Sequence, residues 1–392
     1  METDMRARRC AVLMIEPQER LVFDLGLLGA GGSGLRNALE WMALAPHRDD
    51  EIALTAPEVA VLGELSPSSW TAFDTLMGAH PRDILDALLD KELLIAEGTA
   101  ADARDRQVRD SHWRSAAAVA HYTSRWHGVD TEANEELFAE TTRGTLLDRI
   151  GPAPPAVRER VESDQRLRLP AAAPSALDAL LDRRVTCRNY DGTRALTLPQ
   201  FSATLYRTFG ARAVHDYAPG VQLLKKGVPS AGGLHATEAY LLVQRVEGIE
   251  PGLYHYHPVD HALEPIRRMN ATDAAALARR FVAAQGYLAD AQVFVVPVGR
   301  FRRNFWKYRN HTKAYRALVL DVGHLSQTLY LAATELGLAA FITAAVNEVD
   351  IEQAFGLDPL EEGPLAVCGF GIRAAERREV EFDPLNKVWK AG

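Results

Sequence analysis

Residues 227–243 read GVPSAGGLHATEAYLLV, a glycine-rich turn that runs directly into the apolar, β-rich stretch 239–246. Small residues let the backbone amides of such a turn approach a planar or phosphorylated ligand closely. The turn matches neither the G-x-x-x-x-G-K-[ST] pattern of nucleoside triphosphate loops nor the G-x-S-x-G pattern of hydrolases. Ser230 is therefore a poor candidate for a nucleophile. A glycine-rich turn by itself does not decide between a ligand-binding role and a structural one.

Further β-rich runs are found at 291–298 and 365–370, on either side of a long helix predicted over 315–338. The apolar residues of this helix recur at spacings of three and four. They are Leu318, Val322, Leu325, Leu329, Ala332 and Leu336. Because strands and helices mix without a regular β–α–β alternation, the pattern predicts an α+β fold for residues 175–392.

Upstream, the stretch RRVTCRNYDG spans residues 183–192. Arg184 and Arg188 are four residues apart, and the hydroxyl of Thr186 lies midway. Guanidinium forks and hydroxyls are well suited to phosphate oxygens, so the three side chains could converge on one phosphate. A solvated basic helix end, capped by the loop at Asp191, explains the same residues. The segment alone favours neither interpretation.

Two other clusters carry reactive side chains. His255 and His257 would share one face of a strand, but no nearby carboxylate or cysteine completes a zinc pattern, so we expect a structural hairpin. Lys307 and Tyr308 could form an acid–base pair, because a nearby cation favours the phenolate. A loop with packed aromatic side chains and an exposed lysine explains Lys307 and Tyr308 without chemistry.

The overall composition narrows the class of protein. The 392 residues are enough for two domains, and the net charge of −8 argues against nucleic acid as a partner. Three scattered cysteines cannot form a disulfide framework, which indicates a reducing compartment. Neither a signal peptide nor an apolar run of membrane-spanning length is recognisable. We therefore expect a cytoplasmic protein that binds no metal and no membrane.

Residues 1–98 predict a small module of strands and helices. Strands are expected at 10–15, 21–25 and 91–95, and Thr55 with Glu58 forms a capping-box pair. Helices followed by a strand resemble a winged helix. The acidic helix predicted over 81–90 argues against a DNA reader, so a protein- or peptide-binding role is favoured over plain scaffold.

Residues 99–174 form a bridging region that ends in a proline- and alanine-rich linker. The region contains Trp113, His121, Trp126 and His127. Because their spacing matches no ligand set, we expect these side chains to anchor a connecting helix rather than to form a site.

Taken in order, five segments resemble the nitroreductase-like flavoproteins, and more narrowly the SagB-type dehydrogenases that mature ribosomally made peptides. They are RRVTCRNYDG (183–192), GVPSAGGLHATEAYLLV (227–243), GLYHYHPVDHALEPI (252–266), WKYRNHTKAYRALVLDVGHLSQTLYLAATELGL (306–338) and EEGPLAVCGFG (361–371). The resemblance implies an α+β sandwich around an antiparallel sheet. It also implies a homodimer that holds one flavin mononucleotide (FMN) at each of two interface sites.

The resemblance further implies the roles of individual residues. Arg184, Thr186 and Arg188 match the arginine–serine–arginine set that holds the FMN phosphate and ribityl chain. Thr186 departs from the usual serine but keeps the hydroxyl. The loop that lies along the flavin in the family matches Pro229, Ser230, Ala231, Gly232 and Gly233.

Four more residues acquire expected cofactor contacts in the same way. Gln327 lies on the helix that resembles the family's central dimer helix. Ala344 and Ala345 occupy the segment whose backbone approaches the flavin ring. Arg373 follows the final strand, at a position that can touch the phosphate.

Lys307 and Tyr308 match the lysine–tyrosine pair associated with azoline oxidation in the peptide-maturing branch. The implied activity is the oxidation of azolines to azoles in a precursor peptide, with a cyclodehydratase as a possible partner. The N-terminal module would recognise a leader peptide. Two alternatives stay open: a flavin-dependent reductase of dehydroamino acids or nitro compounds, and a non-catalytic peptide-binding scaffold.

Overall fold

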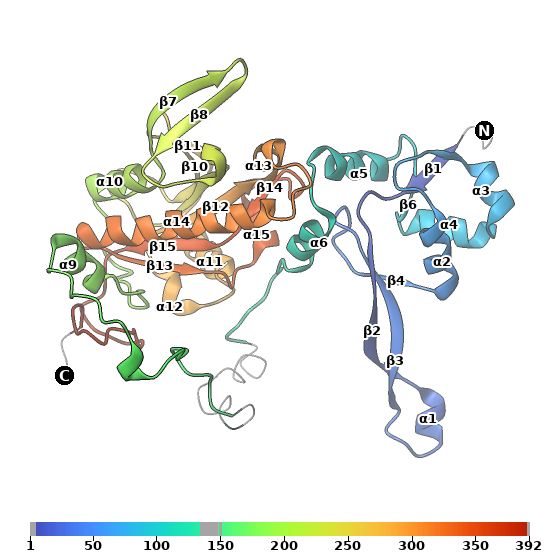
Figure 1. The fold of residues 1–392 in the computed structure, drawn as a ribbon, viewed down its shortest axis with the longest axis horizontal. Helices are drawn as coiled ribbons and strands as arrows, with labels where there is room; N and C mark the ends of the chain where they lie inside the picture. The colour runs from blue at the N-terminus through green and yellow to red at the C-terminus, as the bar shows by residue number, and fades with distance from the viewer. Residues whose placement is uncertain (1–4, 134–147, 149–150, 390–392) are drawn as a thin grey trace. The chain divides into compact units, whose positions relative to one another are not determined.

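The computed structural model describes residues 5–133, 148 and 151–389. They form two compact units. The first comprises Met1–Arg125, Gly299–Leu320 and Gly356–Gly363, and the second comprises Trp126–Val298, Asp321–Phe355 and Pro364–Gly392. Each unit is described by itself below, with the element labels of Figure 1.

The second unit is built around one sheet, in which the strands lie side by side in the order β11-β10-β9-β12-β15-β13. Strand β14 pairs with β12. The strands are β9 (Thr237–Val243), β10 (Gly252–His257), β11 (Ala262–Arg268), β12 (Val293–Arg300), β13 (Ala339–Thr343), β14 (Glu362–Pro364) and β15 (Val367–Gly371). The pairs β9–β10, β10–β11, β12–β15 and β13–β15 are antiparallel.

Helices pack on both faces of this sheet. They are α9 (Ala176–Arg183), α10 (Leu198–Phe209), α11 (Ala271–Phe281), α12 (Gly286–Ala289), α14 (Ala314–Glu335) and α15 (Glu348–Phe355). Along β9, Ala239 and Leu241 belong to the core cluster that includes α10 and α14 residues. The intervening Tyr240 meets Phe355 of α15, with ring centroids 5.3 Å apart. This alternation along β9 is that of a strand buried on both faces, and the second unit is an α+β sandwich.

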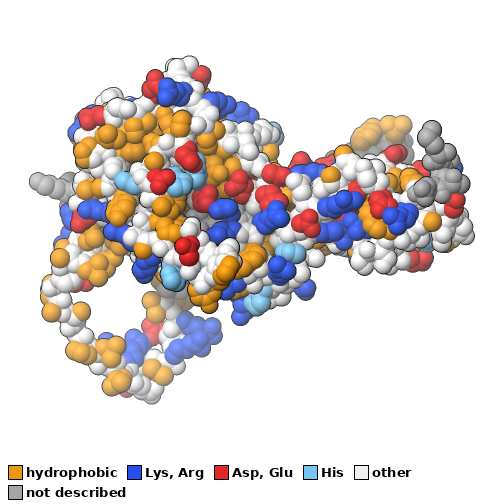
Figure 2. Space-filling model, turned by 90° about the horizontal axis from the view of Figure 1, so that it is seen from above, with side chains coloured by type: hydrophobic (Ala, Val, Ile, Leu, Met, Phe, Trp, Pro, Cys, Tyr) orange, Lys and Arg blue, Asp and Glu red, His pale blue; other side chains and the backbone are white. Residues whose placement is uncertain are grey.

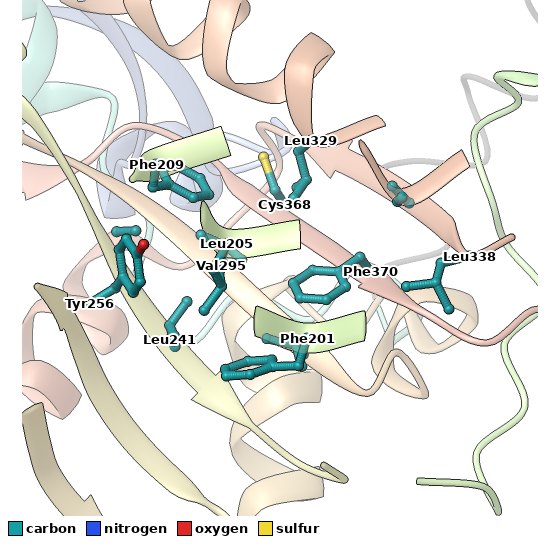
Figure 3. Close-up of a cluster of buried hydrophobic side chains, with 14 of the residues drawn as sticks. Phe201, Leu205, Phe209, Leu241, Tyr256, Val295, Leu329, Leu338, Cys368 and Phe370 are labelled. Carbon is teal, nitrogen blue, oxygen red and sulfur yellow. The ribbon is translucent and has the colours of Figure 1, made fainter. Parts of the chain in front are cut away.

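The core on the α10–α14 side is apolar and closely packed, as Figure 3 shows for ten labelled side chains. Phe201, Leu205 and Phe209 come from α10, at the spacing of one helix face. Leu329 comes from α14, and Phe370 comes from β15. The apolar spacing of three and four predicted for this helix is confirmed for Leu318, Val322, Leu325, Leu329 and Ala332, which are buried. Leu336 lies just beyond the end of α14 at Glu335 and is partly buried.

A hairpin of β7 (Ala211–Ala218) and β8 (Val221–Lys226) leads into the glycine-rich turn. Figure 1 shows this hairpin projecting away from the main sheet. Tyr217 is 70% exposed, so the hairpin contributes little to the core.

The first unit contains two small sheets, with strand orders β5-β1-β6 and β2-β3-β4. The strands are β1 (Arg6–Arg9), β2 (Met14–Phe23), β3 (Leu35–Leu44), β4 (Ile52–Leu54), β5 (Thr71–Ala72) and β6 (Leu94–Ala96). The helices are α1 (Leu25–Gly29), α2 (Ala56–Glu64), α3 (Phe73–Ala79), α4 (Arg82–Asp90), α5 (Ala100–Asp110), α6 (Ser115–Thr123) and α13 (Phe301–Lys307).

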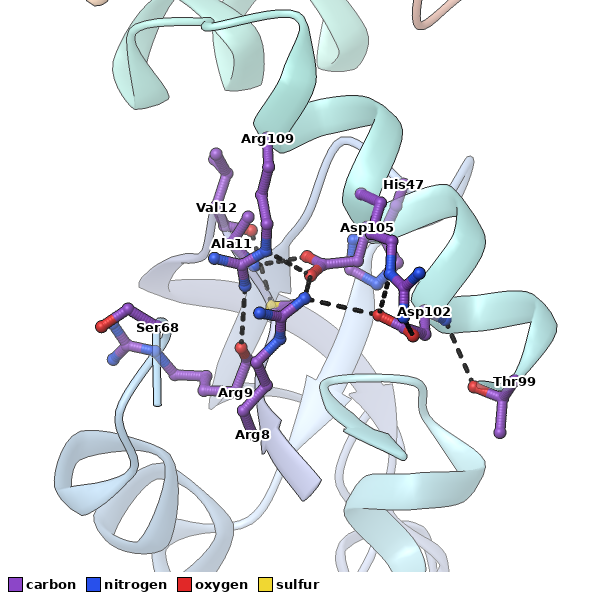
Figure 4. Close-up of polar contacts among 12 residues, drawn as sticks. Arg8, Arg9, Ala11, Val12, His47, Ser68, Thr99, Asp102, Asp105 and Arg109 are labelled. Atoms are coloured by element: carbon purple, nitrogen blue, oxygen red, sulfur yellow. Dashed lines mark hydrogen bonds and ion pairs between the residues drawn. The ribbon is translucent and has the colours of Figure 1, made fainter. Parts of the chain in front are cut away.

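Buried charges fasten α5 to β1, as Figure 4 shows. The Asp105 carboxylate accepts hydrogen bonds from the Arg109 Nε at 2.7 Å and the backbone N–H of Ala11 at 2.5 Å. Arg8 lies 3.4 Å from both Asp102 and Asp105. Since both carboxylates are almost fully buried, these donors are needed to hold them in the interior.

The N-terminal strands differ from the prediction. The expected strand at 10–15 is wrong: β1 ends before Cys10, because the Ala11 N–H is bound by the Asp105 side chain rather than by a strand. The strand expected at 21–25 is the end of β2, which stops at Phe23 because Asp24 caps α1. The capping box of Thr55 and Glu58 is confirmed at the start of α2.

The long β2–β3 hairpin exposes one apolar face. Cross-strand pairing places Glu19 opposite Leu39, Leu21 opposite Asn37 and Phe23 opposite Leu35. Leu21, Phe23 and Leu39 are each more than 60% exposed.

The expected three-domain division, 1–98, 99–174 and 175–392, stays a prediction. Residues 100–123, which composition assigned to the bridging region, are largely helical and belong to the first unit. Residues 134–147 of that region lie outside the described residues.

Among the described helices, none combines the length and the apolar content needed to cross a bilayer.

Candidate functional site

A short extended segment places the side chains of Arg184, Thr186 and Arg188 on one side of the chain. Helix α9 ends at Arg183, and the next residue, Arg184, adopts an extended conformation. The chain then runs beside β13, with the Cys187 N–H donating to the Ala340 carbonyl at 2.9 Å. Val185 and Cys187 are buried, so the alternation of an extended chain turns the other three side chains outward.

These three residues meet in one cavity of about 580 Å³. The cavity is lined on one side by Arg184, Thr186 and Arg188, and on the other by Arg377, Val380, Glu381, Phe382, Asp383 and Pro384. Arg184, Arg188 and Arg377 form no ion pair with any residue in the described part of the chain. Three uncompensated guanidiniums around one cavity favour an anionic ligand.

Tyr330 of α14 supports this side of the cavity, and sequence reasoning missed it. Its hydroxyl lies 2.9 Å from Thr186 Oγ1 and accepts a hydrogen bond from the Ile342 N–H at 3.2 Å. The Arg184 guanidinium lies 5.4 Å from the centroid of the Tyr330 ring. Burial raises the pKa of Tyr330, so the neutral hydroxyl can donate to Thr186. The sequence did offer a signal for Tyr330: a tyrosine on the apolar face of a helix is expected to be buried, and its hydroxyl then needs a hydrogen-bond partner.

The glycine-rich turn forms a short 3-10 segment, Ala231–Gly233, with positive φ at two glycines. Gly232 has φ 59° and Gly233 has φ 69°, which side chains other than glycine adopt at a cost. The Ser230 hydroxyl donates to Asp321 Oδ2 at 2.6 Å and accepts from the His235 N–H at 2.9 Å. The hydroxyl of Ser230 is therefore occupied in shaping the turn, and Asp321 is a second residue that sequence reasoning missed.

The other predicted cofactor residues lie elsewhere in the second unit. Gln327 is exposed on α14, and Ala344 is exposed after β13. The backbone of Ala345 is engaged, because its carbonyl accepts from Gln285 at 2.7 Å and its N–H donates to Thr343 at 3.2 Å. None of these three is among the described residues that line the arginine cavity.

Arg373 does not line that cavity either, among the described residues. Its guanidinium forms an ion pair with Glu381 and stacks 5.5 Å from the Trp389 ring centroid. Glu381 also accepts from the Arg188 N–H at 2.7 Å and from Trp389 Nε1 at 2.8 Å. Burial alone would raise the pKa of Glu381, but these hydrogen bonds and the Arg373 charge hold the pKa below its ordinary value.

Lys307 and Tyr308 lie at the C-terminal end of α13, in the first unit. Lys307 is exposed and Tyr308 is half-buried, and the Lys307 ammonium lies 5.7 Å from the centroid of the Tyr308 ring. Buried Asn304 fixes this helix by donating to the Ala314 carbonyl at 2.9 Å. The structure therefore places the two candidate acid–base groups side by side on a fixed helix end.

The histidines of the β10–β11 hairpin serve the structure. His261 bridges the Tyr256 hydroxyl at 2.7 Å and the Ser202 hydroxyl at 2.8 Å, and His255 pairs with Glu264 at 2.6 Å. The expected hairpin is confirmed. Across the described residues, no group of three or more histidine, cysteine or acidic side chains could hold a metal ion.

The three cysteines are free and buried. Burial raises the pKa of each thiol to about 12, so none is a ready thiolate nucleophile.

On the face shown in Figure 2, basic and acidic side chains are interspersed.

Comparison with known sequences assigns residues 181–372 to the profile of the nitroreductase family. The trifolitoxin-processing protein TfxB of Rhizobium leguminosarum is 32% identical over 154 residues, which is 39% of this chain and 41% of that protein. The microcin B17-processing protein McbC of Escherichia coli is 27% identical over 159 residues, which is 39% of this chain and 57% of McbC. The matches thus span less than two thirds of both processing proteins.

The putative nitroreductase MJ1384 of Methanocaldococcus jannaschii is 28% identical over 205 residues, covering 52% of this chain and 95% of that protein. Among solved structures, the E. coli microcin synthetase McbBCD complex with truncated pro-MccB17 is 21% identical over 68% of this chain and 97% of its matched chain, with a TM-score of 0.49. The profile match includes the glycine-rich turn and the Arg184–Arg188 side of the cavity, whereas the lining residues from Arg377 to Pro384 follow the matched segment. Residues 181–372 are therefore a domain of the nitroreductase family.

Proposed function

We propose that the chain is an FMN-dependent oxidoreductase of the SagB type, which oxidises azolines in a precursor peptide to azoles. The observation that carries the proposal is the cavity in which Arg184, Arg188 and Thr186 meet, with no carboxylate partner for either guanidinium among the described residues. Planar guanidiniums and a hydroxyl match the oxygens of a phosphate monoester. The names of TfxB and McbC, both processing proteins, support a role in maturation.

The residues present fit FMN. The Arg184–Arg188 segment would hold the phosphate, and Tyr330 would keep Thr186 oriented through its 2.9 Å hydrogen bond. The turn 229–233 offers backbone without bulky side chains at Gly232 and Gly233. When bound, FMN supplies the two-electron acceptor that the protein's own side chains lack.

Lys307 and Tyr308 would manage the proton. Conversion of an azoline ring to an azole removes two hydrogens, one as a hydride and one as a proton. A base must take the proton from a ring carbon, and Tyr308 offers a phenol oxygen next to the Lys307 amine, which lies 5.7 Å from the centroid of the Tyr308 ring. We assign the proton to this pair.

The partners follow from the same proposal. On α14, Val319 is 50% and Leu320 is 59% exposed, and a Cβ at Gly323 would meet no atom within 4 Å. An open apolar stripe on a long helix suits a homodimer contact. The N-terminal helices and small sheets would bind the leader of the precursor peptide, and a cyclodehydratase would supply the azolines.

One test starts with the purified full chain. We expect flavin absorbance, and release of FMN rather than a larger flavin on denaturation. Incubation with an azoline-bearing peptide in air should remove the mass of two hydrogens per ring. A colourless protein that takes up no added FMN would overturn the proposal.

A second test isolates the proton-handling pair. Lys307→Ala and Tyr308→Phe should keep flavin absorbance and lose roughly two to four orders of magnitude in turnover. The neighbouring Arg309→Ala serves as the matched control. Full turnover in both variants would remove the assignment.

A reductase is the second candidate, favoured by the match that covers 95% of a putative nitroreductase. Two incubations separate the two directions of chemistry. Under the reductive alternative, the chain would convert a nitroarene or a dehydroamino acid when reduced nicotinamide is added without oxygen. In a second incubation, in air, the azoline peptide would stay unchanged.

A further inference from the structure

Helix α13, which carries Lys307 at its exposed end, is buried on its opposite face. Phe301 and Phe305 lie one turn apart on this helix and are 0% and 1% exposed. Lys307 follows Phe305 by two residues, which is about 200° around a helix, so the two side chains point to opposite faces. The position of Lys307 and Tyr308 therefore depends on what the buried face of α13 packs against.

The buried face of α13 packs against Trp113, which lies in the turn between α5 and α6 and is 4% exposed. The centroid of its ring lies 4.7 Å from that of Phe301 and 4.6 Å from that of Phe305. It also lies 5.6 Å from the ring centroid of Tyr315, in the first turn of α14. Ring contacts of this kind add to the stabilisation that apolar burial gives. One side chain thus contacts both buried phenylalanines of α13 and the helix that follows.

The residue before Trp113 holds the loop that follows Tyr308. The Asn310 N–H donates to the His112 carbonyl at 3.0 Å. Both residues have a positive φ, 57° for His112 and 52° for Asn310. Residues other than glycine keep such a conformation only where the surrounding structure holds it. The loop after Tyr308 is therefore tied to the turn that carries Trp113.

The same turn is also connected to the start of α13. Ser111 is fully buried, and its hydroxyl donates to the Leu360 carbonyl at 3.1 Å. The next carbonyl, that of Glu361, accepts from the Phe301 N–H at 2.9 Å. All of these residues belong to the first unit. The turn 111–113 thus fixes α13 at its start, along its buried face and just beyond its end.

We propose that Trp113 is a positioning residue for the acid–base pair, because it holds α13 and the following loop in one placement. The inference rests on the proposed function, which assigns the proton to Lys307 and Tyr308. Trp113 acts through these two residues and does not contact the reacting atoms. A displacement of about 1 Å in a reacting group can lower a rate by roughly 100-fold, so packing at a distance can control turnover.

Single-turnover kinetics measure this role. The FMN-loaded full chain is mixed with a saturating azoline peptide in the absence of oxygen, and the loss of flavin absorbance is followed. The amplitude reports the fraction of folded, loaded chains, whereas the rate constant reports how well the reacting groups are placed. We expect Trp113→Ala to lower the rate constant roughly 10- to 100-fold.

Two milder variants grade the effect. Trp113→Leu keeps an apolar side chain without the ring and should lower the rate constant about 10-fold, which also covers the case in which the alanine variant does not fold. Trp113→Phe should keep most of the wild-type rate, since it retains a ring against Phe301 and Phe305. It also removes no hydrogen bond, because Trp113 Nε1 has no partner among the described residues.

Hydrogen exchange, measured by mass spectrometry on the flavin-free chain, gives a readout that is independent of turnover. Trp113→Leu should speed exchange of the amides in 301–313 and leave 184–188 unchanged. Leu85→Ala is the matched control, because Leu85 is fully buried in a separate core cluster of the first unit, whose members all precede residue 102. It should keep the wild-type rate constant and the wild-type exchange of 301–313.

A wild-type rate constant in Trp113→Leu would overturn this assignment and leave the proposed function standing, as would unchanged exchange in 301–313. An equal loss of rate in Leu85→Ala would also overturn it, since the loss would then follow from lower stability of the unit alone. A wild-type chain that binds FMN but oxidises no azoline would overturn the proposed function, and this assignment with it.

Discussion

Asp321 on α14 accepts a hydrogen bond from the Ser230 hydroxyl at 2.6 Å, across 91 residues of sequence. Its second oxygen accepts from the Ala231 N–H at 3.1 Å. The carboxylate is 5% exposed, and burial raises its pKa against the lowering effect of these hydrogen bonds. One buried acid thus holds the turn that the proposed function places against the flavin.

Replacing Asp321 should loosen this turn. Asp321→Ala removes both acceptors, and we expect FMN affinity to fall roughly 10-fold, the effect of about one to two lost hydrogen bonds. Asp321→Asn keeps one acceptor oxygen and should lose less. Fluorescence titration measures both, with the exposed Asp260→Asn as control. Unchanged affinity in Asp321→Ala would show that the turn holds its shape without the carboxylate.

Tyr330→Phe should destabilise the second unit while keeping the ring under Arg184. The change leaves the Ile342 N–H and the Thr186 hydroxyl without their present partner. We expect a loss of about 1–3 kcal/mol in the free energy of unfolding, measured in urea. Tyr206→Phe, which also keeps a ring beside an arginine, is the matched control. Equal stability of the two variants would contradict the bridging role.

His121 should make the first unit sensitive to acid. Burial, followed by the charge of Arg125, lowers the pKa of His121 to about 3, from an ordinary value of 6.5. Between these values the unfolded chain binds a proton that the folded chain does not. The free energy of unfolding should therefore fall by up to about 1.4 kcal/mol per pH unit as the pH drops from 6.5 towards 3.

His121→Gln should flatten this dependence, because glutamine can accept from the Tyr315 hydroxyl without titrating. Thermal unfolding at pH 7, 6 and 5 compares its slope with that of the wild type. The exposed His215→Gln should keep the wild-type slope. If the wild type and His121→Gln lose stability equally as the pH falls, His121 is not the source of the acid sensitivity.

Gly369 should not tolerate a side chain. A Cβ there would lie 2.1 Å from Phe341 Cε1, inside the packed sheet. We expect Gly369→Ala to cost about 1–3 kcal/mol in stability, by overpacking. Gly63→Ala in α2 has no atom within 4 Å of the new Cβ and should instead stabilise the chain by up to about 1 kcal/mol. Denaturant unfolding measures both, and a stabilised Gly369→Ala would contradict the packing argument.

The exposed stripe of α14 should control assembly. Val319→Lys combined with Leu320→Lys introduces two charges into the proposed dimer contact and should halve the molar mass measured by light scattering. Val214→Lys with Tyr217→Lys changes an exposed pair on β7 and should leave the mass unchanged. A wild-type chain that is already monomeric would contradict the dimer.

The sequence by itself determined the local architecture of the nitroreductase-family domain. The apolar periodicity of α14 and the β-rich runs of β9, β12 and β15 each depend on neighbouring residues, so they are readable from the chain. The alternation that turns Arg184, Thr186 and Arg188 to one side also follows from an extended backbone. The absence of the strand expected at 10–15 could not be predicted, because a distant carboxylate, Asp105, accepts a hydrogen bond from the Ala11 N–H.

Only the tertiary structure decided which side chains meet. Tyr330 and Thr186 are 144 residues apart, and Asn189 reaches across 190 residues to Glu379. The pairing of Arg373 with Glu381, and the arrival of Arg377 at the cavity, depend on how the segment after β15 folds back. Hydrogen-bond and charge partners of buried groups are chosen by packing, which hydrophobic periodicity does not encode.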